Sequence, residues 1–288
     1  MQILLLGKNG QLGSELHRCL LPLGQVQALD YPEIDLANQG SLRALLQASK
    51  PDIVVNATAY TAVDRAENER ELAYAINATG PAVIADEAKA LGAVFIHYST
   101  DYVFDGKKGA PYDEADTPNP LNVYGTSKLA GEQAIQAVGG ANLILRTAWV
   151  YSLQRDSFVT KVLQWARKNE TLKIVDDQVS NPTWARMLAQ ITTLLLARGP
   201  DYISERAGLY HLAGDGYTSR LGWAKRILML DPKSHEQITR ELIPAATTDF
   251  PTPAERPLLS AMNCAKFCET FHLCLPNWDE ALSLAMNT

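Results

Sequence analysis

Tyr124 and Lys128 stand four residues apart, near the start of a helix predicted over residues 123–138. This spacing puts the phenol and the ammonium on one face of the helix. A free phenol has a pKa of about 10 and is a poor acid at neutral pH, but an adjacent cation stabilises its phenolate. We therefore expect Tyr124 to transfer a proton at a reacting oxygen, with Lys128 beside it to adjust its acidity.

A strand predicted over residues 93–99 brings hydroxyl groups toward this pair. Thr100 would hydrogen-bond a substrate carbonyl beside the phenol, and Ser99 is the competing candidate. Because side chains alternate along a strand, only one of the two should face the site. His97 and Tyr98 have apolar neighbours, and we expect them to pack rather than to react.

A glycine-rich segment links the apolar strand predicted at residues 2–7 to the helix predicted at 11–21. Gly7, Gly10 and Gly13 have a spacing that permits a tight turn and a close approach of the backbone to a ligand. The N-terminus of the following helix offers free N–H groups and a favourable dipole to a pyrophosphate. The segment therefore predicts a dinucleotide cofactor, and with the Tyr–Lys pair it predicts a nicotinamide-dependent reductase.

The cofactor preference depends on Asp30, which ends the strand predicted at 26–30. An acid there would hydrogen-bond the adenosine ribose hydroxyls and repel a 2′-phosphate, which favours NADH. Lys8, within the glycine turn, would offset this repulsion, so we expect NADPH or NADH. Asp35 and Leu36 are candidates for a contact on the adenine side, although a solvated turn before a helix explains them equally well.

The first half of the chain alternates short apolar runs with amphipathic helical stretches, which predicts a parallel sheet covered on both faces. Its strands are predicted at 2–7, 26–30, 53–56, 93–99 and 142–149, and its helices at 11–21, 41–49, 71–91 (interrupted at 80–81) and 123–138. The second half is predicted to hold helices at 158–168, 183–197 and 221–230, strands at 172–175 and 208–212, and a loop at 244–257. The predicted fold class is α/β, a Rossmann-type doubly wound parallel sheet with a smaller C-terminal substrate lobe. We assign 1–150 to the dinucleotide-binding domain and 151–288 mainly to the substrate lobe, with some segments returning to the sheet.

The composition of the 288 residues, 47% hydrophobic and 20% charged, is that of a globular protein. A formal net charge of −6 argues against a nucleic-acid-binding protein, which needs basic patches for phosphates. The longest apolar run, 191–197, is too short to span a bilayer, and the first residues predict a buried strand rather than a signal peptide. We expect a cytoplasmic protein with no nucleic-acid or membrane partner.

Three of the four cysteines, Cys264, Cys268 and Cys274, lie close to His272 in the sequence, which raises the question of a metal site. Their spacing lacks the close cysteine pair of common zinc sites, and apolar residues stand between them. We expect these three, like Cys19 in the first helix, to be buried free thiols.

Beyond these general motifs, the chain resembles the dTDP-4-dehydrorhamnose reductase family of the extended short-chain dehydrogenase/reductases. The strings YTAVDRAE at 60–67 and STDYVF at 99–104 carry the resemblance more specifically than the glycine turn or the Tyr–Lys pair. Further matching segments lie at 5–13, 56–59, 97–98, 120–132, 146–151, 177–183 and 251–257.

The resemblance implies reduction of the C4 keto group of dTDP-4-dehydro-L-rhamnose, the last step of dTDP-L-rhamnose synthesis for O-antigens. Catalytic roles fall to Thr100, Tyr124 and Lys128. The implied cofactor contacts are Gly7, Asn9, Gly10, Gln11, Leu12, Gly13, Asp30, Asp35, Leu36, Ala59, Tyr60, Thr61, Tyr124 and Lys128. The implied substrate contacts are Val63, Thr100, Asp101, Trp149 and Arg256. Arg256 is assigned to the diphosphate because a guanidinium matches phosphate oxygens, although a surface arginine in a proline-rich loop is the plain alternative.

Some members of the family form a metal-bridged dimer through clustered glutamates. Here Glu15 is available, but residues 183–186 offer no acid, so we expect no metal and leave a homodimer open. Two other functions remain in view: another nucleotide-sugar reductase, epimerase or dehydratase, which Asp101 after the hydroxyl keeps open, and a non-catalytic regulatory subunit of the same fold.

Overall fold

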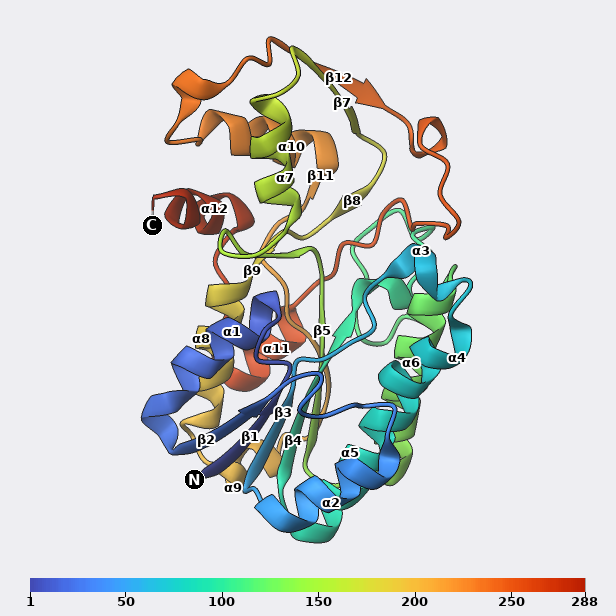
Figure 1. Cartoon of the computed structure of the whole chain (residues 1–288), viewed down its shortest axis with the longest axis vertical. Helices are drawn as coiled ribbons and strands as arrows, with labels where there is room; N and C mark the ends of the chain where they lie inside the picture. The colour runs from blue at the N-terminus through green and yellow to red at the C-terminus, as the bar shows by residue number, and fades with distance from the viewer. Residues whose placement is uncertain (288) are drawn as a thin grey trace.

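A six-stranded parallel sheet organises the lower part of the molecule in the computed structural model, which describes residues 1–287 (Figure 1). Its strands, in spatial order, are β10 (Gly208–His211), β5 (Asn142–Thr147), β4 (Val94–Thr100), β3 (Ile53–Asn56), β1 (Gln2–Leu6) and β2 (Gln25–Leu29). The strand order reverses direction between β1 and β3, and in open α/β sheets ligands bind at the carboxyl ends of the strands beside such a point. This is the predicted doubly wound sheet.

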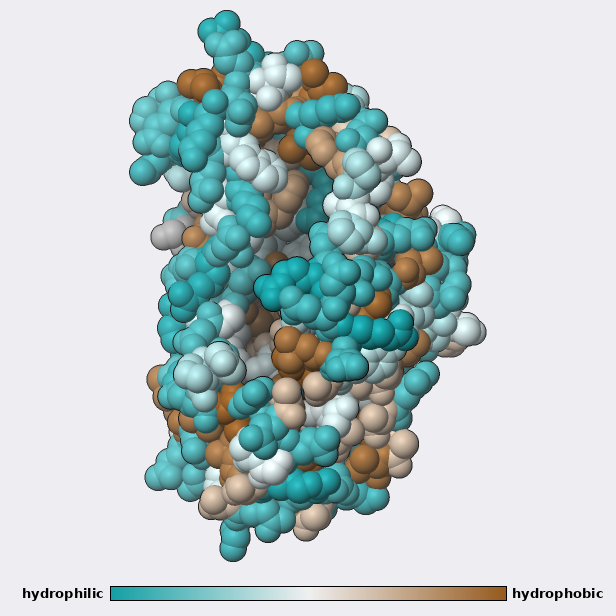
Figure 2. Space-filling model, turned by 45° about the vertical axis from the view of Figure 1, so that its right-hand side comes forward, coloured by the Kyte–Doolittle hydropathy of each residue, from teal (hydrophilic) through white to brown (hydrophobic). Residues whose placement is uncertain are grey.

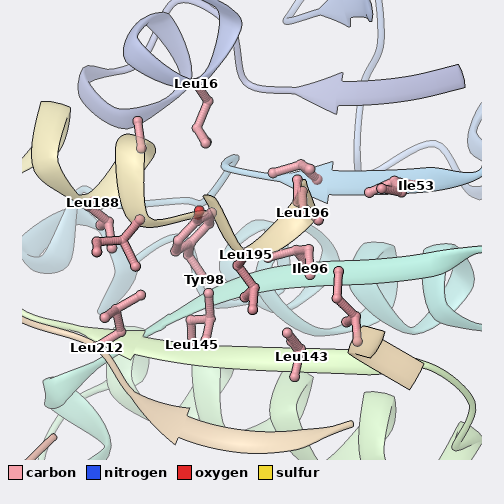
Figure 3. Close-up of a cluster of buried hydrophobic side chains, with 14 of the residues drawn as sticks. Leu16, Ile53, Ile96, Tyr98, Leu143, Leu145, Leu188, Leu195, Leu196 and Leu212 are labelled. Atoms are coloured by element: carbon pink, nitrogen blue, oxygen red, sulfur yellow. The ribbon is translucent and has the colours of Figure 1, made fainter. Parts of the chain in front are cut away.

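Helices cover both faces of the sheet because its central strands are apolar on both sides (Figure 1). On β1, Leu5 faces one apolar cluster and Leu4 the other. The first face is covered by α1 (Gln11–Leu20), α8 (Ala185–Leu196), α9 (Pro200–Ser204) and α11 (Ala265–Phe271), and the second by α2 (Gln39–Ser49), α5 (Gly80–Leu91) and α6 (Val123–Val138). Figure 3 shows the first cluster, in which Leu188 and Leu195 approach Leu145 and Leu143. Each fully buried leucine contributes roughly 1.5–3 kcal/mol.

The upper part of the molecule has an apolar core of its own, centred on the fully buried Trp223 and Tyr151 (Figure 1). Around it lie α7 (Phe158–Ala166), α10 (Arg220–Met229) and α12 (Trp278–Met286), with β7 (Thr171–Val175) paired in parallel to β12 (Glu241–Ala245). The short pairs β6 (Val150–Tyr151) with β9 (Thr183–Trp184), and β8 (Val179–Ser180) with β11 (Thr218–Ser219), complete this part.

Two sequence expectations about elements are wrong, and two helices were not predicted. The interruption expected at 80–81 does not occur: α4 (Arg70–Tyr74) continues through a π-helical turn at 75–79 into α5. Pro81, which has no N–H to donate to the preceding turn, comes directly after this π-helical turn, as the second residue of α5. The loop expected at 244–257 begins inside β12, and α11 and α12 were not expected at all.

None of the helices within residues 1–287 is both long enough and apolar enough to cross a membrane.

Candidate active site

A cleft of about 650 Å³ lies at the carboxyl ends of β1, β3, β4 and β5, where the sheet meets the upper part of the molecule. Figure 2 shows a hollow between these two parts, with hydrophilic surface around it. Thirteen of the residues expected from the sequence line the cleft: Gly7, Asn9, Gly10, Gln11, Leu12, Asp30, Ala59, Thr61, Thr100, Asp101, Tyr124, Lys128 and Trp149. The other lining residues are Ala57, Thr58, Tyr98, Ser99, Thr147, Ala148 and Val150.

The glycine turn between β1 and α1 depends on the absence of side chains. Gly7 has a φ of +93°, and a Cβ on it would lie 2.9 Å from the backbone of Ala57 and Thr58. A Cβ on Gly13 would lie 1.8 Å from the carbonyl oxygen of Gly7, so glycine is required where α1 packs on the turn. Gly10 caps α1 without a side-chain hydrogen bond, which leaves N–H groups at this helix end for a ligand.

Asp30 lies beside the glycine turn, as expected, and its Oδ2 accepts a hydrogen bond from the N–H of Asn9 (2.8 Å). Lys8, in the glycine turn, has its Nζ 2.6 Å from Oε2 of Glu33. The salt bridge with Lys8 lowers the pKa of the Glu33 carboxyl. A negative and a positive charge therefore stand together where the adenosine end of a dinucleotide would lie.

Tyr124 is placed by the start of α6. Asn122 caps the helix by accepting from the N–H of Gly125 (2.8 Å), and its amide donates to the carbonyl of Glu255 (2.7 Å). A Cβ on Gly125 would lie 2.2 Å from the carbonyl oxygen of Tyr102, so glycine lets α6 approach the end of β4. Burial raises the pKa of Tyr124, while a hydrogen bond with Thr100 opposes the rise. The phenol is therefore held in its protonated form.

Thr100 contacts both the phenol of Tyr124 and the carboxyl of Asp101. Its hydroxyl donates to Asp101 Oδ1 (3.2 Å) and accepts from the N–H of Tyr102 (3.2 Å). Asp101 is buried, and its other oxygen accepts from the hydroxyls of Ser180 (3.0 Å) and Ser260 (2.5 Å). Burial raises the pKa of Asp101 against these hydrogen bonds. Asp101 thus orients Thr100 and ties β4 to the upper part of the molecule.

Lys128 lies one helical turn beyond Tyr124 and is 1% exposed. Its Nζ donates to the carbonyl of Tyr98 (2.6 Å) and lies 3.1 Å from Nε2 of His97. Burial lowers the pKa of Lys128 to about 8, and the charge of Glu132 opposes this. The amine is therefore held by β4, on the floor of the cleft.

Ser99 and Thr100 both line the cleft, so the expectation that only one of them faces it is wrong. The cleft lies across the end of β4 rather than over one face of the sheet, and both hydroxyls reach it there. The hydroxyls of Ser99 and Thr147 and the side-chain oxygen of Gln11 are buried and have no hydrogen-bond partner within the described residues. Unpaired buried polar atoms are costly, so these three groups indicate a ligand in the cleft.

Trp149 forms part of the cleft wall, with a backbone φ of +41°. Its ring stacks on Trp223, with the centroids 5.5 Å apart, and the guanidinium of Arg220 lies 3.6 Å from the centre of the Trp149 ring. Asp101 and Tyr102 act on Arg220 through their charges, but no salt bridge joins it to an acid in the part of the chain described. Nothing in the sequence singles out this cation, because an arginine at the start of a helix carries no motif.

Arg256 is held by protein groups, in contrast to Arg220. Its two terminal nitrogens lie 2.7 and 2.8 Å from the carboxylate oxygens of Asp64, and it also donates to the carbonyl of Ala254 (2.5 Å). Neither Arg256 nor Arg220 is part of the cleft lining itself, so the two differ in their partners rather than in this respect. The expected diphosphate contact therefore has no support in this geometry, because the guanidinium is already neutralised.

Five more expected residues lie away from the cleft lining. Gly13 packs under the glycine turn, and the phenol of Tyr60 donates to Glu69 (2.6 Å). Val63 begins α3 (Val63–Ala66). Leu36 is buried in the core beneath α2 and α5, and Asp35 accepts from the N–H of Ala37 within its own turn (2.9 Å).

The cysteines differ from expectation. Cys268 and Cys274 are paired as a disulfide, so the prediction of buried free thiols is wrong for both. The turn after α11 brings them together, which sequence spacing alone does not show. Cys19 and Cys264 are free, and burial raises the pKa of the Cys264 thiol to about 12.

Glu15 is balanced by two guanidinium groups, from Arg18 (2.5 Å) and Arg186 (3.5 Å). Within residues 1–287, no three His, Cys, Asp or Glu side chains are grouped as a metal ion would require.

A doubly wound sheet with a glycine turn, a buried Tyr–Lys pair and a cleft joining them defines a Rossmann-type oxidoreductase. A family model described as the RmlD substrate binding domain matches residues 1–288. Two dTDP-4-dehydrorhamnose reductases are each 41% identical to the chain: one from Burkholderia thailandensis (99% of this chain and 98% of that protein) and one from Escherichia coli K12 (100% and 97%). The chain belongs to the dTDP-4-dehydrorhamnose reductase family.

Solved structures agree with this assignment. A dTDP-4-dehydrorhamnose reductase from Clostridium acetobutylicum has a TM-score of 0.91 at 33% identity, with 100% of this chain and 99% of that chain covered. The enzyme of the same name from Bacillus anthracis, solved in complex with NADP, has a TM-score of 0.90 at 31% identity over 99% and 98%. A Thermus thermophilus UDP-glucose 4-epimerase in complex with NAD shares the fold, with a TM-score of 0.81 at 18% identity over 100% and 98%.

Proposed function

We propose that this chain reduces the C4 keto group of dTDP-4-dehydro-L-rhamnose to dTDP-L-rhamnose, with NADPH or NADH as the reductant. The observation that carries the proposal is the meeting of Thr100, Tyr124 and Lys128 in the same cleft as the glycine turn. The names of the full-length relatives supply the sugar, and the cleft supplies the chemistry.

The cleft residues fit a dinucleotide on grounds independent of those names. A volume of about 650 Å³ lies within the usual range of roughly 300–1,000 Å³ for ligand pockets. The backbone of Gly7 and Gly10 is open to a pyrophosphate, and Asp30 stands where ribose hydroxyls would lie. The unpaired oxygen of Gln11 and the unpaired hydroxyls of Ser99 and Thr147 offer further contacts. Lys8, in the glycine turn and paired with Glu33, keeps both cofactors in the proposal.

The proposed proton donor is Tyr124. When bound, the cofactor supplies the hydride, and the phenol gives its proton to the oxygen at C4 of the sugar. Because burial raises the pKa of Tyr124, the phenol carries this proton at neutral pH. Thr100, whose hydroxyl donates to Asp101 in this structure, would turn its O–H to the oxygen at C4 beside the phenol, because a carbonyl oxygen can only accept. Lys128 would hold the nicotinamide ribose, and its positive charge would stabilise the phenolate that remains.

The proposed contact for the substrate diphosphate is Arg220 rather than Arg256. Arg220 is a cation without a paired acid, stacked on the Trp149 wall of the cleft, whereas Arg256 is bound to Asp64. An anion beside Arg220 would supply the direct salt-bridge partner that it lacks among the described residues.

The test is to follow nicotinamide absorbance during incubation with dTDP-4-dehydro-L-rhamnose, with NADPH and NADH in separate runs. We expect a fall in absorbance equal to the amount of sugar reduced. Conversion of the sugar with constant absorbance would indicate a redox-neutral isomerase and would refute the proposal. Cofactor binding without any turnover of this sugar would refute it in favour of another substrate or a regulatory role.

A further inference from the structure

Three fully buried side chains form a line beneath the cleft: Asn56 at the end of β3, His97 on β4 and Lys128 on α6. The amide nitrogen Nδ2 of Asn56 lies 3.2 Å from Nδ1 of His97, and Nε2 of His97 lies 3.1 Å from Nζ of Lys128. The imidazole therefore joins the amide to the amine. The proposed reduction uses only the last of the three.

Thr58 fixes the direction of the Asn56 amide. The backbone N–H of Thr58 lies 3.0 Å from Oδ1 of Asn56, and a backbone N–H can only donate. The hydroxyl of Thr58 is also directed at Oδ1, at 2.5 Å. The oxygen of the amide must therefore face Thr58, and its NH₂ group must face His97.

The direction of the amide decides which ring nitrogen of His97 carries the proton. An NH₂ group donates, so Nδ1 of His97 must accept, and a neutral imidazole then has its proton on Nε2. That N–H is aimed at Nζ of Lys128. An ammonium has three donors and no acceptor, whereas an unprotonated amine has a lone pair.

We infer that His97 is a positioning residue: Asn56 holds its proton on Nε2, and from there it donates to Nζ of Lys128 and favours the unprotonated amine. The second polar contact of Nζ, the carbonyl of Tyr98 at 2.6 Å, accepts from either form of the amine. The inference rests on the proposed function only for its effect on turnover. The hydrogen-bond chain itself does not depend on the substrate.

We assign this role to His97 because the other charged and titratable groups around Lys128 are held in one protonation state or bound by another residue. On α6, Tyr124 precedes it by one turn and is held protonated, and Glu132 follows by one turn. Glu132 is already bound by Arg146 through two hydrogen bonds of 2.9 and 2.7 Å. Burial acts in the same direction as His97 and lowers the pKa of Lys128 to about 8. A free lysine has a pKa of about 10.4. The charge beside Tyr124 should thus change just above neutral pH.

The direct test is the position of the imidazole proton, measured by ¹⁵N NMR on histidine-labelled protein without cofactor or substrate. The chain has five histidines, and the His97→Phe spectrum identifies the signals of His97. We expect the proton on Nε2 and a ring that stays neutral at pH 6, because burial lowers the pKa of His97 well below its usual value. A proton on Nδ1 in the unmodified protein would overturn the inference.

Two variants show which neighbour sets the tautomer. Asn56→Asp keeps the shape of the side chain but can only accept, so it should move the proton of His97 to Nδ1. Lys128→Met removes the partner at Nε2 and should leave the proton there. Asn77→Asp is the control, because Asn77 is also fully buried but donates to Ser127 instead of His97. It adds the same charge and should leave the proton on Nε2.

The kinetic readout is the pH at which kcat falls on the alkaline side. In Asn56→Asp, Nε2 accepts from the ammonium, so this pH should rise by at least about one unit. If the proton of His97 moves to Nδ1 in Asn56→Asp but the pH at which kcat falls stays unchanged, the inferred effect of His97 on Lys128 is refuted. If Asn56→Asp does not fold, the spectra of the unmodified protein and of Lys128→Met decide the inference alone. Absence of any reductase activity would refute the proposed function and leave the NMR result to stand separately.

Discussion

The two sides of the cleft differ in how their residues are brought together. On the sheet side, the glycine turn, Thr100, Tyr124 and Lys128 come from the ends of consecutive parallel strands and the helix that follows. On the upper side, contacts join residues that are remote in the sequence. Asp64 binds Arg256 across 192 residues, and Asp101 binds Ser260 across 159.

This difference shows which parts of such an enzyme can be predicted from its sequence. In a doubly wound sheet, the carboxyl ends of the strands meet at one edge, so residues at those ends share a site whatever the rest of the chain does. The upper side depends on how irregular segments fold over that edge, which periodicity does not specify. The arrangement of Thr100, Tyr124 and Lys128 therefore follows from the sheet, whereas the wall of the cleft around Trp149 depends on the upper part.

The largest effect should come from the sheet side. Tyr124→Phe removes the proposed proton donor and should reduce kcat by about 10²–10⁴-fold, with cofactor binding largely kept. Steady-state kinetics and cofactor titration measure the two quantities. Turnover close to that of the unmodified enzyme would remove Tyr124 from its role.

The glycine turn offers a matched pair of substitutions. Gly13→Ala would place a Cβ 1.8 Å from a backbone carbonyl oxygen and should lower the free energy of unfolding by about 3 kcal/mol or more. At Gly10 the nearest atom would lie at 3.5 Å, so Gly10→Ala should change stability by only about 1 kcal/mol and should mainly weaken cofactor binding. Denaturant unfolding and cofactor titration check both. Equal stability of the two variants would contradict the packing described for Gly13.

On the upper side, Arg220 and Arg256 should respond differently to substitution. Arg220→Met removes the unpaired cation and should raise the KM for the sugar nucleotide about 10–100-fold, which corresponds to about 1.4–2.8 kcal/mol, with little change in Tm. Arg256→Met breaks the pair with Asp64 and should lower Tm while changing KM less. The opposite pattern would return the diphosphate contact to Arg256.

The pH dependence of kcat reports on Lys128. The pKa of this buried lysine is lowered to about 8, so the amine loses its charge as pH rises through 8, well before a free lysine would. Because the ammonium stabilises the phenolate left on Tyr124, kcat for reduction should fall above about pH 8. A profile that stays flat to about pH 10, the range of a free lysine, would show that burial does not depress this pKa.

The smallest effect should come from the disulfide. Cys268→Ser opens a loop with a sequence separation of only 6, so the loss of stability should be about 2 kcal/mol or less, with kcat and KM unchanged. Thermal unfolding with and without a reductant provides the measurement. A loss of activity would mean that the C-terminal segment shapes the cleft more than its position indicates.

Much of the sheet side could be predicted from the sequence, and little of the upper side. The strands β1 to β5 alternate with helices in a pattern that specifies their order and direction, and Asp30, Thr100 and Tyr124 accordingly line one cleft. Arg220 could not be found, because its importance comes from stacking on Trp149 and from the lack of a partner acid. The ion pair that argues against Arg256 could not be predicted either, since its partner Asp64 is visible only in the folded chain.

The place of His97 could be predicted from the sequence only in part. Its burial was expected from its apolar neighbours, but its contact with Lys128 depends on the distance between β4 and α6. No spacing within one element reveals such a contact. Asn56 likewise ends a short apolar strand and carries no motif of its own.

The central claim is that the Tyr124–Lys128 pair and the glycine turn serve one bound dinucleotide. A crystal structure with NADPH tests it most directly. The account predicts the pyrophosphate on the backbone of the turn at 7–13 and the nicotinamide ring between Tyr124 and Trp149, with Lys128 Nζ on its ribose. A cofactor bound elsewhere, or one whose nicotinamide ring lies outside the cleft, would contradict the account.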